Sequence, residues 1–164
     1  MKNEIEFTAL AETYMDMIYR IALHVVQRPE DAEDVTQNVL LRLYRSGPEF
    51  DSTDHARHWL VRVTVNEAKR LVTLPHRKRE TGMEDMAAEI AAESFPGADS
   101  LHRELFQAVM DLPVKYRLPM YLYYYEGYAV REIAEITGSR LSTVQTRLAR
   151  GREKLKHVLG EEWK

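Results

Sequence analysis

Hydrophobic residues recur every three or four positions along most of the chain, which is the period of an amphipathic helix. This spacing predicts a first helix over Glu4–Gln27, a second over Pro29–Ser46 and a third over His55–Leu74. The apolar stripe of the first helix consists of Phe7, Leu10, Tyr14, Ile18, Ile21 and Val25. No segment alternates convincingly between apolar and polar residues, as a half-buried strand does. The pattern therefore predicts an all-α protein.

Proline and polar residues indicate where these helices begin. Pro29 suits the first turn of a helix, because the N–H that it lacks would be unpaired there. Acidic side chains follow at positions 30, 31, 33 and 34 and complement the positive end of the helix dipole. The polar stretch over residues 47–54 is a predicted loop, and it supplies the N-cap candidates Asp51, Ser52, Thr53 and Asp54 for the third helix.

Residues 75–98 carry prolines and glycines at both ends and mixed charge between them, which predicts a flexible linker with room for a short helix over Met83–Ala92. Beyond the linker, helical periodicity covers Ser100–Asp111, breaks at Leu112–Pro113 and resumes up to Glu126–Gly127. The predicted organisation is two small helical domains, residues 1–74 and 99–164. Three helices in the first domain enclose a small core, so we expect limited independent stability.

The segment AVREIAEITGSRLSTVQTRLARGREKLKHVL has the layout of a helix-turn-helix. A short helix ends at Gly138, which can adopt the left-handed cap, and a second helix begins near Leu141 or Ser142. The residues predicted to face inward are Val130, Ile133, Ala134 and Ile136 in the first helix and Val144, Leu148, Leu155 and Leu159 in the second. The opposite side of the second helix carries Thr143, Thr146, Arg147, Arg150 and Lys154.

Composition describes an ordinary globular protein of 164 residues, 45% apolar and 30% charged. An apolar run of about 18 residues and a basic leader are both missing, so we expect neither a membrane span nor a signal peptide. The chain has no cysteine, which excludes disulfides and thiolate metal sites. We therefore expect a cytoplasmic protein.

The net charge is −3, which argues against a protein covered with nucleic-acid-binding charge. The distribution is uneven, because residues 1–74 and 75–98 are acidic while residues 99–164 are basic. Between Arg140 and Lys156, six Lys/Arg face a single Glu. Any contact with DNA is therefore expected on particular faces only.

Two helical faces suit nucleic acid. Hydroxyls and arginines on the second helix of the C-terminal motif suit a recognition helix, because arginine bonds guanine edges or phosphates and threonine adds phosphate and methyl contacts. The polar face of the third helix suits single-stranded nucleic acid, because bases stack on aromatic rings while cations follow phosphates. That face carries Trp59, Arg62, Asn66, Lys69, Arg70 and Thr73. A duplex-reading element and a strand-holding element in one chain indicate promoter recognition.

Two alternative functions remain open, and each predicts a different binding partner. A helix-turn-helix repressor or activator would bind its operator without polymerase, usually as a dimer, and the size of the chain in solution distinguishes it. A metal-dependent hydrolase would use a cluster at the start of the third helix, although such residues more often cap helices. That cluster would contain Asp51, Asp54, His55 and His58.

Three segments follow one another along the chain: EDAEDVTQNVLLRLYR, FDSTDHARHWLVRVTVNEAKR and LPVKYRLPMYLYYYEGYAVREIAEITGSRLSTVQTRLARGREKL. In these segments, their order and their spacing, the chain resembles the bacterial extracytoplasmic-function sigma factors. This resemblance implies a sigma-2-like bundle of three or four helices and a sigma-4-like helix-turn-helix domain. It also implies an initiation subunit that recruits core RNA polymerase to promoters and has no catalytic site, metal or cofactor of its own.

The resemblance also implies roles for particular residues. Polymerase docking on the clamp helices falls to Asp31, Asp34, Gln37 and Leu41, of which the last three lie opposite the buried stripe of Ala32, Val35, Val39 and Leu43. The pocket for a flipped minus-ten base is expected to be lined by Arg42, Ser46, Phe50 and Asn66, with Trp59, Arg62, Lys69 and Arg70 near the opened strand. The minus-thirty-five element would be read by Arg140, Ser142, Thr143, Thr146, Arg147 and Arg150.

The same resemblance implies further partners and some departures. We expect contact with the polymerase flap and control by an anti-sigma factor, which can hold the chain at the membrane without insertion; the active form would lie in the nucleoid. No small-molecule substrate is expected. Gln145 replaces a common lysine, and Pro119 falls inside an expected helix, where proline deletes a hydrogen bond and kinks the chain. Core packing is the expected role of Tyr121, Tyr123, Tyr124 and Tyr125, with cover over the Pro119 region or contact with the flap as alternatives.

Overall fold

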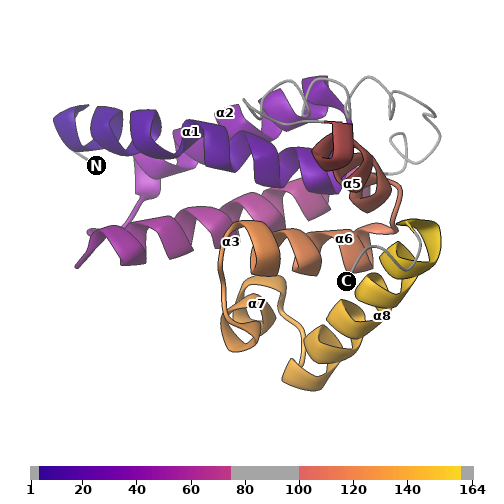
Figure 1. Cartoon of the computed structure of the whole chain (residues 1–164). Helices are drawn as coiled ribbons and strands as arrows, with labels where there is room; N and C mark the ends of the chain where they lie inside the picture. Colours follow the sequence, from indigo (N-terminus) through magenta and orange to yellow (C-terminus); the bar gives the residue numbers. More distant parts are fainter. Residues whose placement is uncertain (1–3, 75–99, 160–164) are drawn as a thin grey trace. The chain divides into compact units, whose positions relative to one another are not determined.

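The computed structural model describes the backbone of residues 4–74 and 100–159, and side chains within 6–74 and 103–157. These residues form seven α-helices and one π-helical segment, and no strand occurs among them, so the predicted all-α fold is confirmed. The chain divides into two compact units, Met1–Met83 and Glu84–Lys164 (Figure 1). The predicted linker and its short helix lie outside the described residues.

The first unit is a three-helix bundle of α1 (Glu4–Val26), α2 (Pro29–Ser46) and α3 (Thr53–Val72), in which each helix packs against the other two. The stripe predicted on α1 faces this core: four of its residues are buried, and Phe7 and Leu10 are half-buried. The large buried side chains of the bundle include Ile18, Ile21, Leu23, Val35, Leu43 and Leu60. Periodicity therefore placed the apolar faces correctly.

Local chemistry sets the helix boundaries in this unit. Helix α1 ends at Val26, one residue before the predicted end, because Gln27 adopts a left-handed backbone with φ 61°. Pro29 is the first residue of α2, as predicted. Among the four candidates for the N-cap of α3, Ser52 takes the role, and its hydroxyl accepts a hydrogen bond of 3.1 Å from the backbone N–H of His55.

The second unit consists of α5 (Ser100–Met110), α6 (Val114–Met120), the π-helical segment η1 (Tyr121–Tyr125), α7 (Val130–Thr137) and α8 (Leu141–Leu159). Helix α8 packs against α5, α6 and α7, and is thus the central element of this unit. The core includes Leu122, Ile133, Ile136, Val144, Leu148 and Leu155, while the side chain of Leu159 lies outside the described set. One buried cation, Arg117, donates hydrogen bonds to the carbonyls of Met110 and Leu112 and so ties the end of α5 to α6.

The helix containing Pro119 runs on through this residue to Met120 and then widens into η1. In η1 the N–H of Glu126 donates to the carbonyl of Tyr121, five residues earlier, over 3.1 Å. Core packing is confirmed for Tyr121, which is 5% exposed. The same prediction was wrong for the three tyrosines that follow, which are 37%, 56% and 51% exposed at positions 123, 124 and 125.

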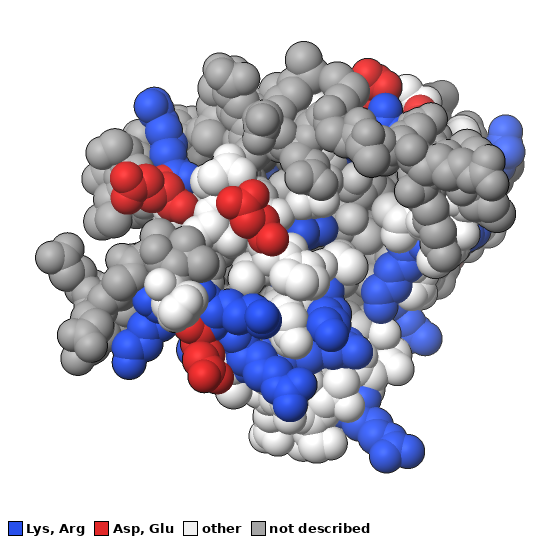
Figure 2. All heavy atoms as spheres, turned by 90° about the vertical axis from the view of Figure 1, so that its right-hand side faces the viewer, with Lys and Arg blue, Asp and Glu red and all other residues white. Residues whose placement is uncertain are grey.

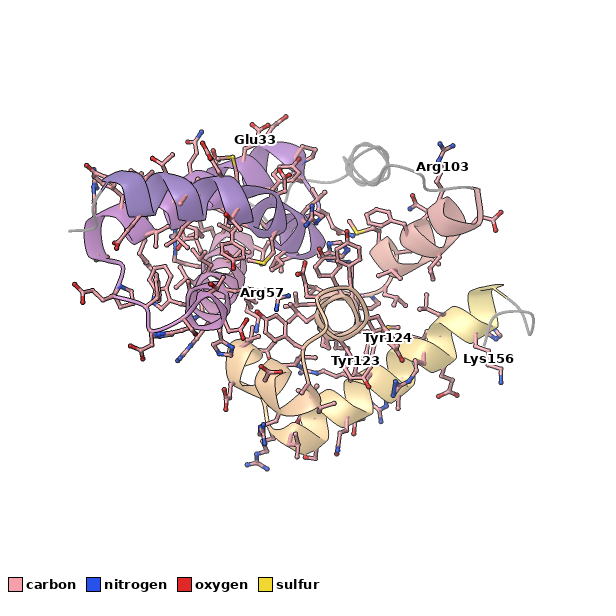
Figure 3. All side chains as sticks on the ribbon, turned by 60° about the vertical axis from the view of Figure 1, so that its left-hand side comes forward. Glu33, Arg57, Arg103, Tyr123, Tyr124 and Lys156 are labelled. Atoms are coloured by element: carbon pink, nitrogen blue, oxygen red, sulfur yellow. The ribbon has the colours of Figure 1, made fainter. Side chains whose placement is uncertain are left out.

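Of the exposed tyrosines, Tyr124 lies next to α8, and the ring of Tyr123 meets that of Tyr124 edge to face with centroids 4.9 Å apart (Figure 3). The hydroxyl of Tyr124 accepts a hydrogen bond of 2.7 Å from the guanidinium of Arg152, and the same cation lies 5.9 Å from the ring centroid. Their exposure has a geometric reason, since a π turn adds a residue to each turn and rotates the following side chains away from the core positions of an α-helix.

Among the helices that the structure describes, none combines the length and the apolar character needed to cross a membrane.

Candidate nucleic-acid and docking interfaces

The turn between α7 and α8 has the geometry of a helix-turn-helix. Gly138 caps α7 in the left-handed region, with φ 68° and ψ 30°, which glycine adopts without a steric penalty. At the other end of α7, the carboxylate of Glu132 accepts a hydrogen bond of 2.9 Å from the backbone N–H of Ala129. Helix α8 begins three residues after Gly138, at Leu141. The turn predicted from the sequence is therefore confirmed in its position and in its cap.

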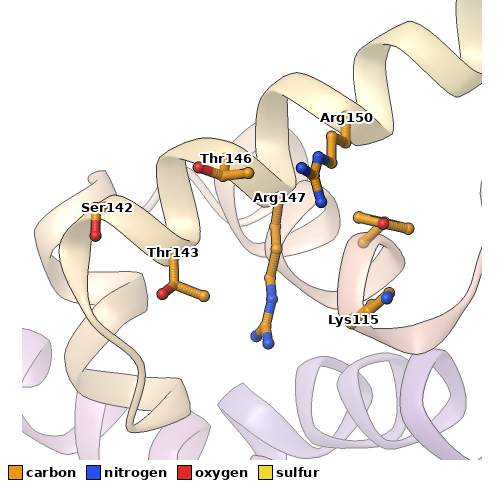
Figure 4. A pocket seen from close by; sticks show the side chains of 7 residues that line it. Lys115, Ser142, Thr143, Thr146, Arg147 and Arg150 are labelled. Carbon is orange, nitrogen blue, oxygen red and sulfur yellow. The ribbon is translucent and has the colours of Figure 1, made fainter.

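The outward side of α8 forms one wall of an open hollow of about 290 Å³. The residues that line it are Ser142, Thr143, Thr146, Arg147 and Arg150 from α8 and Lys115 and Tyr116 from α6 (Figure 4). Five of the six residues predicted to read the minus-thirty-five element are thus brought together, while Arg140 is exposed in the turn that precedes α8. The two residues from α6 were not predicted, because their place beside α8 depends on how the helices pack.

Electrostatics in this hollow is dominated by cations. Burial acts to raise the pKa of the Tyr116 phenol. The charge of Lys115, together with the hydrogen bond and the charge from Arg150, has a larger effect in the opposite direction, so the pKa of Tyr116 is lowered. The amino groups of Lys115 and Lys154 lie 5.1 Å and 5.6 Å from the centroid of the same ring. The potential here therefore favours an anion.

One arginine of the hollow is also held by the turn. The guanidinium of Arg147 lies 3.5 Å from the hydroxyl of Ser139, and this hydroxyl lies 3.0 Å from that of Thr137. A bond of this length is weak, so it orients the arginine without preventing a contact with DNA. Figure 2, turned toward the side on which α8 lies, shows Lys and Arg side chains gathered on the lower part of the surface with few carboxylates among them.

The residues predicted at the minus-ten element form two groups on α2, α3 and the loop between them. In the first group, the half-buried rings of Phe50 and Trp59 meet edge to face with centroids 5.8 Å apart, and the ring centroids of His55 and Phe50 are 5.1 Å apart. Trp59 therefore contacts the loop and keeps part of its surface exposed. Such a ring can accept a stacked base only on the part of its face that Phe50 leaves uncovered.

The second group is organised by a carboxylate that sequence reasoning missed. Glu67, on α3, is 8% exposed and accepts hydrogen bonds of 2.7 Å from Arg70 and 3.3 Å from Asn38 on α2. The bond from Arg70 is the main reason why the pKa of Glu67 is lowered, and the charge of Arg42 contributes in the same direction. Glu67 thus gathers two predicted cations, Arg42 and Arg70, at the junction of α2 and α3.

The other predicted members lie around this junction. Arg62 and Asn66 are exposed on α3, Lys69 is half-buried, and the hydroxyl of Ser46 donates a hydrogen bond of 3.2 Å to the carbonyl of Arg42. Thr73 caps α3, and its hydroxyl donates to the carbonyl of Arg70 over 2.9 Å. A shared pocket of Phe50 and Asn66 for one flipped base stays a prediction.

The exposed face of α2 carries three of the four residues predicted to dock on polymerase. Asp34, Gln37 and Leu41 are exposed, and Leu41 leaves 47% of its surface to solvent. Asp31 differs from them, because it is 5% exposed and lies one helical turn before the buried Val35. The docking role stays a prediction for the three exposed residues, while burial disfavours Asp31 as a direct contact.

The geometry does not assemble the alternative metal site at the start of α3. The ring nitrogen Nδ1 of His55 accepts the backbone N–H of Asp51 over 3.2 Å and lies 4.0 Å from its carboxylate. Among the side chains that the structure describes, no group of three or more His, Asp or Glu lies close enough to hold a metal ion. His55 instead helps to close the loop that precedes α3.

Comparisons with known proteins agree with these two units. The family model for Sigma-70 region 2 matches residues 10–79, and that for Sigma-70, region 4 matches residues 102–155. Similar solved structures include the sigma factor RpoE with the anti-sigma factor NepR from Bartonella quintana (TM-score 0.68, 20% identity, 94% of this chain and 96% of that one). CnrH with the cytosolic domain of CnrY is also similar (TM-score 0.67, 20% identity, 96% and 89%). At this identity they show the shared fold.

Curated relatives extend the comparison to most of the chain. SigW of Bacillus subtilis, an ECF RNA polymerase sigma factor, is 28% identical over 93% of this chain and 88% of its own length. RNA polymerase sigma factor CarQ of Myxococcus xanthus is 30% identical over 79% of this chain and 75% of its own length. SigE of Mycolicibacterium smegmatis is 29% identical over 93% of this chain, which spans 61% of the relative's length. The chain therefore belongs to the sigma-70 family, in its extracytoplasmic-function group of RNA polymerase sigma factors.

Proposed function

We propose that this chain binds core RNA polymerase and directs it to promoters that carry a minus-ten and a minus-thirty-five element. The observation that carries the proposal is the outward side of α8, where hydroxyls and arginines line one open hollow behind a glycine-capped turn. That surface suits the major groove, in which arginine reads guanine and threonine contacts phosphates and methyl groups.

The two units divide the work. Residues 1–74 dock on the clamp helices of the polymerase and hold the opened minus-ten strand, and residues 99–164 read the minus-thirty-five duplex and contact the flap. Residues 75–98 connect them. Leu41 is an exposed apolar residue on α2, and Glu67 bonds Arg70 and attracts Arg42 at the junction of α2 and α3, so these features support a docking surface and a DNA surface within the first unit.

Holding an unstacked base lowers the free energy needed to melt the promoter. Extruding one base costs a few kcal/mol, and stacking on an aromatic side chain returns about 1–3 kcal/mol per base. Trp59, half-buried against Phe50, is a suitable ring, and Arg62, Lys69 and Arg70 supply charge for the phosphates. Binding alone therefore accounts for the activity, and the chemistry of bond formation belongs to the polymerase.

The chain is expected to work in the cytoplasm, at the nucleoid when active, without a cofactor or catalytic site of its own. Two proteins of similar fold are described in complex with an anti-sigma factor and with the cytosolic domain of CnrY. We infer that an anti-sigma factor also controls this chain and can hold it at the membrane.

A reconstituted transcription assay tests the proposed function. Core polymerase, with and without the chain, would be incubated with a genomic promoter library, and start sites would be mapped. Transcripts that depend on the chain, with two shared upstream elements, are expected. The absence of any transcript above core polymerase alone would refute the proposal.

Two single substitutions separate docking from DNA reading. Asp34→Ala, at an exposed position, should weaken association with core polymerase and leave the fold intact, which circular dichroism and a binding titration would show. Arg147→Ala should mainly weaken recognition of the upstream element. Unfolding caused by Asp34→Ala would identify this residue as structural and remove it from the docking surface.

A further inference from the structure

The hollow between α6 and α8 has the composition of an anion site. Its seven lining residues comprise three cations, three aliphatic hydroxyls and a tyrosine, with no carboxylate among them. Lys115 and Arg150 are exposed and Arg147 is half-buried. Within the described part of the chain, none of these three cations forms an ion pair with a carboxylate. Their charge is therefore available to a ligand.

The wall contributed by α6 is separate from the predicted recognition surface. Lys115 and Tyr116 lie 14 or more positions before Val130, where the helix-turn-helix begins. Their place beside α8 comes from the packing of α6 against that helix. Figure 4 shows Lys115 on the opposite side of the hollow from Ser142, Thr143 and Thr146. A ligand that enters the hollow therefore meets two helices.

Tyr116 forms a buried support for this charge. It is 7% exposed, and the amino group of Lys115 lies 5.1 Å from its ring centroid. A cation over an aromatic face is stabilised by the ring quadrupole. This contact limits the positions of an otherwise flexible lysine, so its amino group stays near the hollow.

We propose that Lys115, supported by Tyr116, completes with the arginines of α8 a phosphate-binding subsite that holds one backbone phosphate of the upstream duplex. This inference rests on the proposed role of α8 in duplex binding. Lysine presents a compact point charge and lacks the planar fork with which arginine reads guanine. Lys115 therefore anchors the duplex without selecting its sequence, and α8 supplies the selection.

An open hollow favours a phosphate that belongs to DNA over a free one. Exposed charges are screened within about 8 Å at physiological ionic strength, so a few exposed cations hold a single small ion weakly. A duplex backbone delivers its phosphate together with many other contacts and releases counterions as it binds. Both sources present the same phosphate chemistry, and competition by free phosphate distinguishes them.

The test uses holoenzyme reconstituted from core polymerase and the full chain, with a labelled duplex that contains the upstream element and no minus-ten element. Lys115→Gln should reduce the slope of log affinity against log salt by about 0.9. The loss of affinity should accordingly be about threefold greater at about 50 mM than at about 200 mM salt. Lys115→Arg should keep the wild-type slope, because it keeps the charge.

Controls separate this effect from a general loss of positive charge or of sequence reading. Lys156→Gln removes an exposed lysine at the other end of α8 and should leave the slope nearly unchanged. Lys115→Gln should weaken binding to the native and to a scrambled upstream element by the same factor, whereas Arg147→Ala should reduce the ratio between them. A slope for Lys115→Gln equal to that of Lys156→Gln would overturn the proposal.

Inorganic phosphate identifies the source of the bound group. Phosphate and chloride at equal ionic strength should inhibit duplex binding equally if the hollow holds only a DNA phosphate. Binding of inorganic phosphate to the chain that Lys115→Gln abolishes, together with an unchanged salt slope for duplex binding by that variant, would assign the hollow to a free anion and overturn the assignment to DNA. Wild-type holoenzyme that fails to initiate at any promoter would instead refute the proposed function, independently of Lys115.

Discussion

Replacing Leu41 with alanine tests whether the exposed face of α2 docks on polymerase. Complete burial of a leucine side chain is worth about 1.5–3 kcal/mol. Leu41 is 47% exposed, so covering the remaining surface in a complex supplies about half of this, or about 1 kcal/mol. A difference of this size corresponds to a rise of about threefold to tenfold in the dissociation constant for core polymerase.

The assay is a titration of fluorescently labelled chain with core polymerase, read by anisotropy. Leu41→Ala should weaken binding by the stated factor and change the stability of the free chain by less than about 0.5 kcal/mol, as is usual at surface positions. Thermal denaturation of the free variant measures the second quantity. If the melting temperature fell enough to explain the weaker binding, the role of Leu41 would be in folding and not in docking.

Met15→Ala is the matched control. Met15 is 43% exposed on α1 and is a large apolar residue outside the predicted dock. Its removal should leave the dissociation constant unchanged. The assignment of this face to polymerase would be refuted if the dissociation constant of Leu41→Ala were equal to that of the wild type within error, or if Met15→Ala raised the dissociation constant by the same factor.

Three further predictions concern stability. The pKa of Glu67 is lowered in the folded chain. The carboxylate therefore adds to the free energy of unfolding at pH values above its ordinary pKa of about 4.3, and this contribution is lost as the pH falls through the lowered pKa of the folded chain. Glu67→Gln should therefore lower the free energy of unfolding by about 1 kcal/mol at neutral pH, a value reduced because Arg70 is exposed. The difference in melting temperature between this variant and the wild type should become smaller in acid. Gly138→Ala should cost about 1 kcal/mol in urea denaturation, because φ is 68° and an added Cβ meets no atom within 4 Å. Gly151→Ala should lower the free energy of unfolding by about 1–3 kcal/mol in the same assay, because the added methyl group crowds Met120. No loss of stability, as for a substitution by alanine at an exposed position, would show that α6 shifts to make room for the methyl group.

Local signals in the sequence were sufficient for the start of α2 and the end of α7, whereas α3 begins and ends two residues earlier than predicted. Proline at 29 and glycine at 138 act through their own backbones, so their effect can be predicted from the residue itself. Gln27 lacks such a signal, because glutamine rarely adopts a positive φ, and the end of α1 was misplaced by one residue. The prediction that the tyrosines after Pro119 pack in the core used residue type alone, and it failed for three of the four, which lie in a π-helical segment that the sequence did not indicate.

Candidate residues were predictable where one helix face defines them, and were missed where two helices meet. The hydroxyls and arginines of α8 share a face, so helical spacing finds them. Glu67 is linked to Asn38 across 29 positions, and Lys115 reaches the same hollow as Arg147 through the packing of α6 on α8. Such contacts depend on tertiary structure, for which one sequence carries no local signal.

The uneven charge explains why the proposed function needs a polymerase. Affinity for duplex DNA that is independent of sequence grows with the number of phosphates neutralised, and a chain with net charge −3 offers cations on a few faces only. The free chain is therefore expected to bind DNA weakly. Docking through α2 would place the cations of α3 and α8 beside the same promoter, so each contact with DNA forms at a high effective concentration. The surfaces on α3 and α8, each of which binds DNA weakly alone, then give specific binding only in the holoenzyme. Promoter opening is thereby restricted to complexes that can transcribe.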